Sequence, residues 1–190
     1  QGEGEITFPE LVKAFEIKKG FKGIKGVIYK KGNKVIKNQP RELIQDLDSL
    51  PFPARHLIPM EKYLQHPENA IASIRKPTTE IISSRGCPFN CIFCSIQTVW
   101  GRKWRARSAK NVVDELELLY NKYGIREFRF FDDNISWDKK RMNEICDEII
   151  NRKLRIKWDT PNGVAISTLN EQVLRKMRDA GYYKAIFGIE

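Results

Sequence analysis

The sequence predicts an α/β protein built on a parallel sheet. From residue 79 onward, short runs rich in β-branched and aromatic residues alternate with longer segments that carry apolar residues at helical spacing. The connections are only a few residues long, and this alternation is typical of parallel sheets with right-handed crossovers. Polar residues follow each predicted strand, where ligand sites lie in sheets of this class.

The first forty residues predict a helix and a β-hairpin. Residues 7–10 are typical of a helix start, because Pro9 would fall in the first turn, where a missing N–H loses no partner. Residues 26–37 hold two β-branched runs around a Gly-Asn turn, which predicts a hairpin. The expected helix would have an apolar face formed by Leu11, Val12 and Phe15.

Residues 41–74 predict a proline-rich linker that packs along its neighbours. Pro51, Pro53 and Pro59 exclude a helix interior or a central strand. Three regions are therefore expected: the C-terminal end of an upstream domain over 1–40, this linker over 41–74, and the first part of a barrel-like α/β domain over 75–190.

Strands and helices are expected to follow in regular order after the linker. Ser108 and Gly124 are a typical N-cap and C-terminal glycine of the first helix there. Strands are predicted over 79–84, 127–131, 155–158 and 183–189. Two further helices are predicted, over about 138–153 and from a capping box at 168–171 to Gly181.

Composition narrows the class of protein. Hydrophobic residues make up 41% of the chain, with no run of about eighteen apolar residues and no signal peptide. Clustered cysteines without a secretion signal are typical of metal ligands in a reducing compartment, which predicts a cytoplasmic protein. The chain starts at Gln1, so we expect a fragment of a longer protein.

The net charge of +10 raises the question of nucleic acid. Nine lysines lie within residues 13–37, but no aromatic stacking platform accompanies them. This pattern favours a solvated surface, and nucleic acid is not an expected partner.

Three cysteines within eight residues are the most specific feature: Cys87, Cys91 and Cys94. Thiolates this close point at one inorganic centre, and a four-iron cluster normally takes four of them. Three thiolates would leave the fourth iron with a coordination position open to a small molecule. A zinc site is likewise catalytic when one of its coordination positions is not filled by the protein. A zinc loop lacking one ligand and a disulfide with a spare thiol remain alternatives. Cys146 lies in an apolar helical stripe and is expected in the core.

The cysteine loop resembles the signature of the radical S-adenosylmethionine superfamily, Cys-x3-Cys-x-aromatic-Cys, with Phe93 as the aromatic residue. Further stretches resemble the cobalamin-binding branch of that superfamily: residues 1–5, 84–88, 105–108, 130–134 and 187–190. The resemblance covers essentially the whole chain. It implies a partial (β/α) barrel of the TIM type, preceded by the C-terminal remnant of a cobalamin-binding Rossmann-like domain.

The resemblance also implies site residues. The three cysteines would bind a 4Fe–4S cluster whose open iron is chelated by S-adenosylmethionine, and Phe93 would pack against the adenine. Asp132 and Asp133 stand where relatives often carry Gly-Gly-Glu to receive the methionine ammonium, and only one of two adjacent acids is expected to face the ligand. Glu190 resembles an acid near the ribose hydroxyls.

The implied function is reductive cleavage of S-adenosylmethionine followed by methylation, cyclisation or rearrangement at an unactivated carbon of a small-molecule substrate. Cobalamin would be bound mainly by residues absent from this chain, and flavodoxin or ferredoxin would be the reductant. An electron-transfer iron–sulfur protein is an alternative that would need a fourth cysteine nearby. A tRNA-modifying radical methylthiotransferase would carry three more N-terminal cysteines, and residues 1–86 contain none.

An aromatic and basic stretch follows the cysteines and is expected to line the substrate side. It would favour a large, partly apolar substrate with an anionic group. A stretch that merely packs on another domain is the alternative. Its residues are Trp100, Arg102, Trp104, Arg105 and Arg107.

Overall fold

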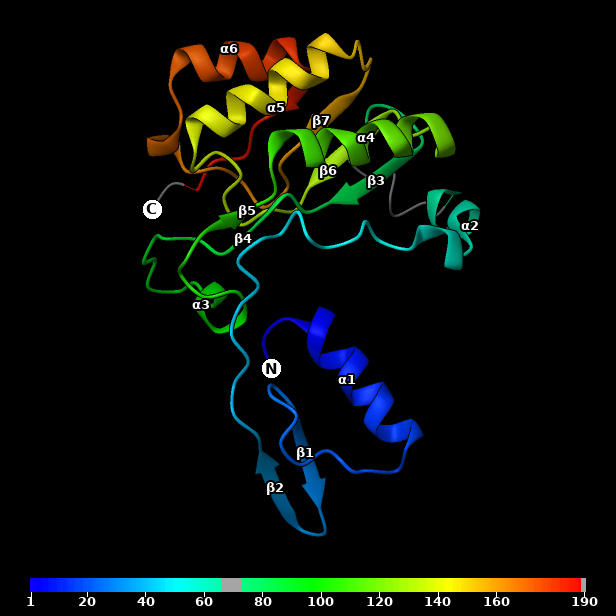
Figure 1. Ribbon diagram of the computed structural model, residues 1–190. Coiled ribbons are helices and arrows are strands. Elements are labelled where there is room, and N and C mark those ends of the chain that lie inside the picture. Colours follow the sequence, from blue (N-terminus) through cyan, green and yellow to red (C-terminus); the bar gives the residue numbers. More distant parts are fainter. Residues whose placement is uncertain (66–72, 189–190) are drawn as a thin grey trace. The chain divides into compact units, whose positions relative to one another are not determined.

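The computed structural model describes residues 1–65 and 73–188, and the chain divides into two compact units (Figure 1). One unit, here called the N-terminal unit, contains Gln1–Leu50 and Gly86–Trp104. The other, the sheet unit, contains Pro51–Arg85 and Arg105–Glu190. The predicted regions 1–40, 41–74 and 75–190 remain predictions, because compactness alone does not identify a domain.

The N-terminal unit holds the predicted helix and hairpin. Strands β1 (Ile28–Lys31) and β2 (Lys34–Lys37) pair antiparallel, which confirms the hairpin. Helix α1 (Gly4–Glu16) begins three residues before the predicted start, and Pro9 lies inside it. The predicted start is therefore wrong: Glu3, in an extended conformation, is the N-cap, and the hydroxyl of Thr7 donates to the carbonyl of Lys25 at 3.3 Å.

The apolar face predicted for α1 is not buried in this unit. The buried residues of the helix are Thr7 and Ala14, whereas Phe15 is 73% exposed and Val12 is also exposed. Helical spacing therefore identified the helix but not the side that packs.

The sheet unit confirms the predicted α/β architecture. Its four strands are all parallel and follow the order β3-β6-β7-β8. The strands are β3 (Thr78–Ile81), β6 (Glu127–Phe130), β7 (Lys157–Asp159) and β8 (Tyr182–Lys184). The connecting helices lie along one side of the sheet (Figure 1) and are α4 (Ala109–Tyr123), α5 (Lys139–Asn151) and α6 (Glu171–Asp179).

The main core lies between these helices and the sheet. Phe128 and Trp158 are neighbours in the β6–β7 register and are completely buried. Cys146 on α5 is buried in the same cluster, as predicted. The Trp158 indole Nε1 donates to the carbonyl of Ala180 at 3.1 Å, so its polar atom is satisfied inside the core.

Short elements connect and flank these layers. The segment before β3 contains η1 (Arg55–Leu57) and α2 (Met60–Gln65), and η3 (Ile166–Thr168) precedes α6. The first predicted strand is shorter than 79–84, because β3 ends at Ile81 and residues 84 and 85 form a separate strand, β4 (Ser84–Arg85). Strand β4 pairs antiparallel with β5 (Arg105–Ala106).

The N-terminus of α6 differs from the predicted capping box. Asn170, not Thr168, is the N-cap, and its side chain accepts from the Val173 N–H at 2.8 Å. The Thr168 hydroxyl instead donates to the carbonyl of Ala165 at 2.7 Å. The box is therefore wrong, because η3 turns Thr168 away from the helix.

Replacing Asn170 with alanine is expected to lower the free energy of unfolding by about 1 kcal/mol, since a helix N-terminal N–H loses its acceptor. Urea denaturation would measure this. Glu171→Ala is the matched control, because it removes only an exposed ion pair with Arg175 and should change stability by less than about 0.5 kcal/mol. Equal losses in the two variants would contradict the assignment of the cap.

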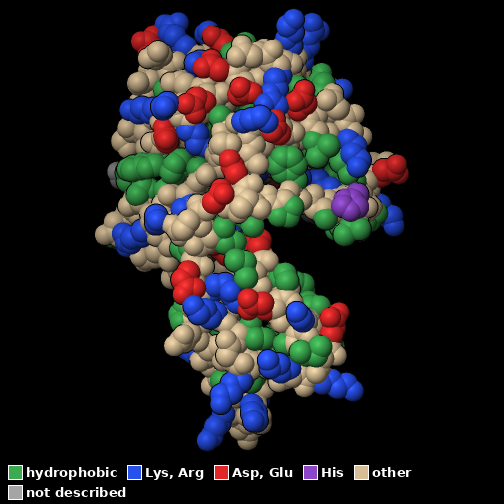
Figure 2. All heavy atoms as spheres, in the orientation of Figure 1, with side chains coloured by type: hydrophobic (Ala, Val, Ile, Leu, Met, Phe, Trp, Pro, Cys, Tyr) green, Lys and Arg blue, Asp and Glu red, His purple; other side chains and the backbone are tan. Residues whose placement is uncertain are grey.

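Charge is distributed as the sequence predicted. Figure 2 shows Lys and Arg side chains spread over the visible face with Asp and Glu between them. The lysines of the hairpin, Lys30, Lys31, Lys34 and Lys37, are exposed. Within residues 1–65 and 73–188, no helix has the length and apolar character needed to span a membrane.

Candidate functional site

The clustered cysteines lie on a loop whose two ends meet at a short ladder. Ser84 pairs with Ala106 and Arg85 with Arg105 in β4–β5. The chain between them, Gly86–Trp104, belongs to the N-terminal unit and contains the four-residue helix α3 (Ile96–Val99). We call Gly86–Trp104 the cysteine loop and the β4–β5 ladder its neck.

The start of the cysteine loop depends on a glycine. Gly86 has φ = +85°, and a Cβ atom there would lie 2.6 Å from the carbonyl oxygen of Lys103. The loop therefore closes on itself by a backbone contact that no other residue would allow without a shift.

The donor atoms of the loop fit an iron–sulfur cluster in their chemistry. Cys87, Cys91 and Cys94 are partly exposed, and none is in a disulfide, which disagrees with the disulfide alternative. The described residues contain no group of three His, Cys, Asp or Glu side chains that could hold one metal ion, so the expected convergence on a single point is not present. A 4Fe–4S cluster does not require it, since each thiolate binds a different iron.

Phe93 is not a core residue of the N-terminal unit. Phe93 as a whole is 74% exposed, and the neighbouring Ile92 is fully exposed. The aromatic residue beside the third cysteine is therefore exposed, and its packing against an adenine remains a prediction.

The two adjacent acids after β6 have different surroundings. Asp132 is buried and accepts hydrogen bonds from Ser83 N–H (3.1 Å), Ser83 Oγ (2.8 Å) and Ser84 Oγ (2.5 Å). Burial raises the pKa of Asp132, although these hydrogen bonds and Arg141 act in the opposite direction. Asp133 is partly exposed, and Glu190 lies outside the described residues. The carboxylate of Asp132 is thus engaged by Ser83 and Ser84 within the sheet unit, and a ligand role for either acid remains a prediction.

Two of the arginines expected on the substrate side are engaged within the sheet unit, and the substrate side itself remains a prediction. Arg105 is only 4% exposed, on β5. Arg107 donates to Asn111 Oδ1 at 2.7 Å and to Glu115 at 2.6 Å. Arg102 is exposed, and its Nε and Nη2 donate to the side-chain oxygen of Gln97 at 3.1 and 2.6 Å.

A buried ion-pair group was missed by the sequence reasoning. Glu115 on α4 is 1% exposed and accepts from Arg55 Nη1 (2.5 Å) and Arg107 Nη1 (2.6 Å). Through these ion pairs α4 binds the segment before α2, which contains Arg55, and the residue that follows the neck, Arg107. No local pattern signals it, because Glu115 has the spacing of an ordinary polar helix residue.

A row of alternating charges crosses the sheet on the face opposite the core. The β-pairing places Glu80, Arg129, Asp159 and Lys184 side by side on consecutive strands. Asp159 is buried, with Arg129 Nε 3.6 Å away, and neither of its carboxylate oxygens has a hydrogen-bond partner among the described residues. Burial raises the pKa of Asp159, with Arg129 and Lys184 opposing this effect.

The raised pKa of Asp159 predicts a pH-dependent effect of Asp159→Asn. The pKa of Asp159 is higher in the folded chain than in the unfolded chain. At pH values between the two, the folded chain binds more protons, so the free energy of unfolding falls as the pH rises through the folded pKa. The amide variant lacks this loss and should be more stable by about 1 kcal/mol at pH 8, a gain that shrinks as pH falls. Urea denaturation at pH 8 and pH 4 would measure both.

Glu127 provides the matched control for this prediction. It is also fully buried, but it accepts from Ile74 N–H (2.9 Å), Arg75 N–H (2.7 Å) and Tyr183 OH (2.8 Å). Glu127→Gln should therefore destabilise the fold. A loss of stability in Asp159→Asn at pH 8 would show that its carboxylate is satisfied and contradict the prediction.

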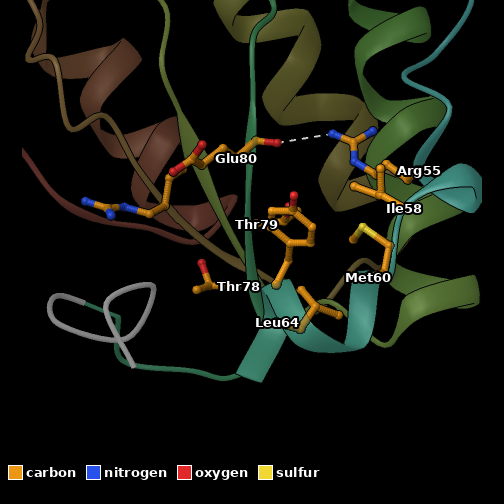
Figure 3. A pocket seen from close by; sticks show the side chains of 9 residues that line it. Arg55, Ile58, Met60, Leu64, Thr78, Thr79 and Glu80 are labelled. Atoms are coloured by element: carbon orange, nitrogen blue, oxygen red, sulfur yellow. Dashed lines mark hydrogen bonds between the residues drawn. The ribbon is translucent and has the colours of Figure 1, made fainter. Parts of the chain in front are cut away.

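A cavity of about 260 Å³ lies beside the edge strand β3 (Figure 3). Ile58, Met60 and Leu64 line one side, and Thr78, Thr79 and Glu80 of β3 line another. Arg55 Nη2 bridges to the Glu80 carbonyl at 3.2 Å. Of the predicted site residues that the structure describes, Cys87, Cys91, Phe93, Cys94, Asp132 and Asp133, none lines this cavity.

Comparison with known proteins gives consistent matches. The family model described as the radical SAM superfamily matches residues 81–189. The chain is 40% identical over its full length to an uncharacterized methyltransferase of Pyrococcus horikoshii, of which it covers 39%. It is 31% identical over its full length to the anaerobic magnesium-protoporphyrin IX monomethyl ester cyclase of Cereibacter sphaeroides, of which it covers 31%. The chain thus spans well under half the length of these relatives.

A solved structure has the same fold. The cobalamin-dependent S-adenosylmethionine radical enzyme OxsB, with aqua-cobalamin and S-adenosylmethionine bound, superposes with a TM-score of 0.78 at 19% identity. The match covers 100% of this chain and 27% of the OxsB chain. At this identity the likeness concerns the fold.

Proposed function

The chain belongs to the radical S-adenosylmethionine superfamily, and from this premise we propose that it binds a 4Fe–4S cluster and cleaves S-adenosylmethionine reductively. The observation that carries the proposal is the Cys-x3-Cys-x2-Cys loop, which lies within the matched span and keeps its thiols out of disulfides. When bound, the cluster would supply the electron that breaks a carbon–sulfur bond of the sulfonium.

The roles of the protein residues follow from their surroundings. Cys87, Cys91 and Cys94 would hold three irons and leave one open to the amino and carboxylate groups of S-adenosylmethionine. The exposed ring of Phe93 would stack on the adenine. Asp133 would accept the methionine ammonium, since a carboxylate has the charge and acceptors for it.

The names of the relatives guide the second half of the proposal. One is a methyltransferase and another a cyclase, so we propose methylation or cyclisation at an unactivated carbon of a small molecule. Cobalamin would be held mainly by residues outside this chain, and a flavodoxin or ferredoxin in the cytoplasm would deliver the electron. The substrate would carry the anionic group expected above.

Anaerobic reconstitution of the full-length protein with iron and sulfide tests the proposal. We expect about four irons and four sulfides per chain, and release of methionine and 5′-deoxyadenosine when dithionite and S-adenosylmethionine are added. Stoichiometric zinc with no uptake of iron would contradict it. Cluster assembly without any cleavage of S-adenosylmethionine would limit the protein to electron transfer.

A further inference from the structure

Two buried side chains of the sheet unit, Asp132 and Arg141, form hydrogen bonds to the residues at and beside the neck of the cysteine loop. Asp132 binds Ser83 and Ser84, where the chain enters the neck. Arg141, in the first turn of α5, donates from Nη2 to the Ser83 carbonyl at 2.9 Å and from Nε to the Arg107 carbonyl at 2.6 Å, where the chain leaves. The Arg107 N–H also donates to the Ser83 carbonyl, at 3.0 Å.

The cysteine loop itself has no core. From Cys87 to Trp104 no residue is buried, and α3 buries none of its four residues. Full burial of side chains usually fixes the shape of a segment, and from Cys87 to Trp104 the side chains are at most partly buried. The hydrogen bonds of Asp132 and Arg141 at the neck are buried or partly buried, and a hydrogen bond to a charged group contributes about 1.5–3 kcal/mol.

We infer that Asp132 and Arg141 are positioning residues for the cluster, acting through Ser83, Ser84 and Arg107 on the two points from which the cysteine loop departs and returns. The inference rests on the proposed function. It assigns the two adjacent acids to different tasks: Asp132 fixes the chain three residues before Cys87, and Asp133 meets the ligand.

The split between the acids gives a matched pair of variants, Asp132→Asn and Asp133→Asn. In the full-length apo protein, trypsin reports on the cysteine loop through its exposed sites at Arg102 and Lys103. Asp132→Asn should speed this cleavage about tenfold, which corresponds to the weakening of a charged hydrogen bond. Asp133→Asn should be cut at the wild-type rate.

The reconstituted protein supplies a second measurement. Asp132→Asn should lose iron to a chelator about tenfold faster than the wild type, with an altered electron paramagnetic resonance spectrum of the reduced cluster. Asp133→Asn should keep its cluster and bind S-adenosylmethionine about tenfold more weakly. Asn170→Ala controls for general loss of stability, because it weakens α6 without touching the neck and should leave both rates unchanged.

If Asp132→Asn does not fold, Ser84→Ala is tested in its place. This variant removes only the hydrogen bond that the Ser84 hydroxyl donates to the Asp132 carboxylate. Wild-type rates of cleavage and iron loss in both variants would overturn the inference. So would weaker S-adenosylmethionine binding in Asp132→Asn with an intact cluster, which would make Asp132 a ligand residue. If the wild type takes up no iron, the proposed function fails, and the trypsin measurement alone decides whether the neck is held by Asp132.

Discussion

Serine in place of any one of Cys87, Cys91 or Cys94 is expected to abolish the cluster. Each thiolate would hold a separate iron, and the loop offers no fourth cysteine that could substitute for a lost ligand. We therefore expect iron content to fall from about four per chain to near zero after anaerobic reconstitution, with the visible absorption of the cluster lost and no 5′-deoxyadenosine formed.

Cys146→Ser is the control for these variants. Cys146 is completely buried on α5, and burial raises the pKa of its thiol to about 12, so it stays protonated and is a poor metal ligand. The variant should retain its iron, although the buried hydroxyl will lower stability. Loss of the cluster on changing Cys146, or its survival in one of the three loop variants, would show that the ligands are misassigned.

The sheet unit could be predicted from the sequence because its signals are local. Ser108 caps α4 by accepting from the Asn111 N–H, and Gly124 ends the helix in the left-handed region, as their residue types predicted. Alternation of Phe128 and Phe130 with charged neighbours placed β6, and its apolar face is the one that packs on the helices.

Roles that depend on distant partners could not be predicted in this way. Asp132 had the position and charge of a ligand residue, but its acceptors are used by Ser83 and Ser84, which lie 49 and 48 residues away along the chain. The same holds for Arg107, whose ion pair with Glu115 could not be read from the sequence. A sequence pattern gives the chemistry of a side chain, and only the fold decides which partner uses it.

The grouping of the cysteine loop with the N-terminal residues is likewise a long-range effect. Lys103 Nζ donates to Gln45 Oε1 at 2.5 Å, and a Cβ atom placed on Gly101 would lie 3.5 Å from Cδ1 of Leu43. Both contacts join segments about sixty residues apart. Gln45 and Leu43 belong to the linker expected over residues 41–74. The prolines that predict this linker show where regular structure stops, but they do not show which segment the linker packs against.

Gly181→Ala is expected to destabilise the sheet unit strongly. Gly181 has φ = +100°, and a Cβ atom there would overlap the carbonyl oxygen of Ile156, which belongs to the backbone and cannot rotate away. The strained φ contributes about 1–2 kcal/mol, and the shift of the backbone that leads into β7 about 1–3 kcal/mol more. We therefore expect a loss of about 3 kcal/mol, measured by urea denaturation.

Gly124→Ala separates the two contributions. Gly124 also follows a helix and has a positive φ of +67°, but a Cβ atom there would have no neighbour within 4 Å. This variant should lose only the conformational part, about 1 kcal/mol. The difference between the two variants then measures the overlap with Ile156. Equal losses would mean that the chain between α6 and β8 moves aside at little cost, and that the close approach of Gly181 to β7 does not fix the position of the last strand.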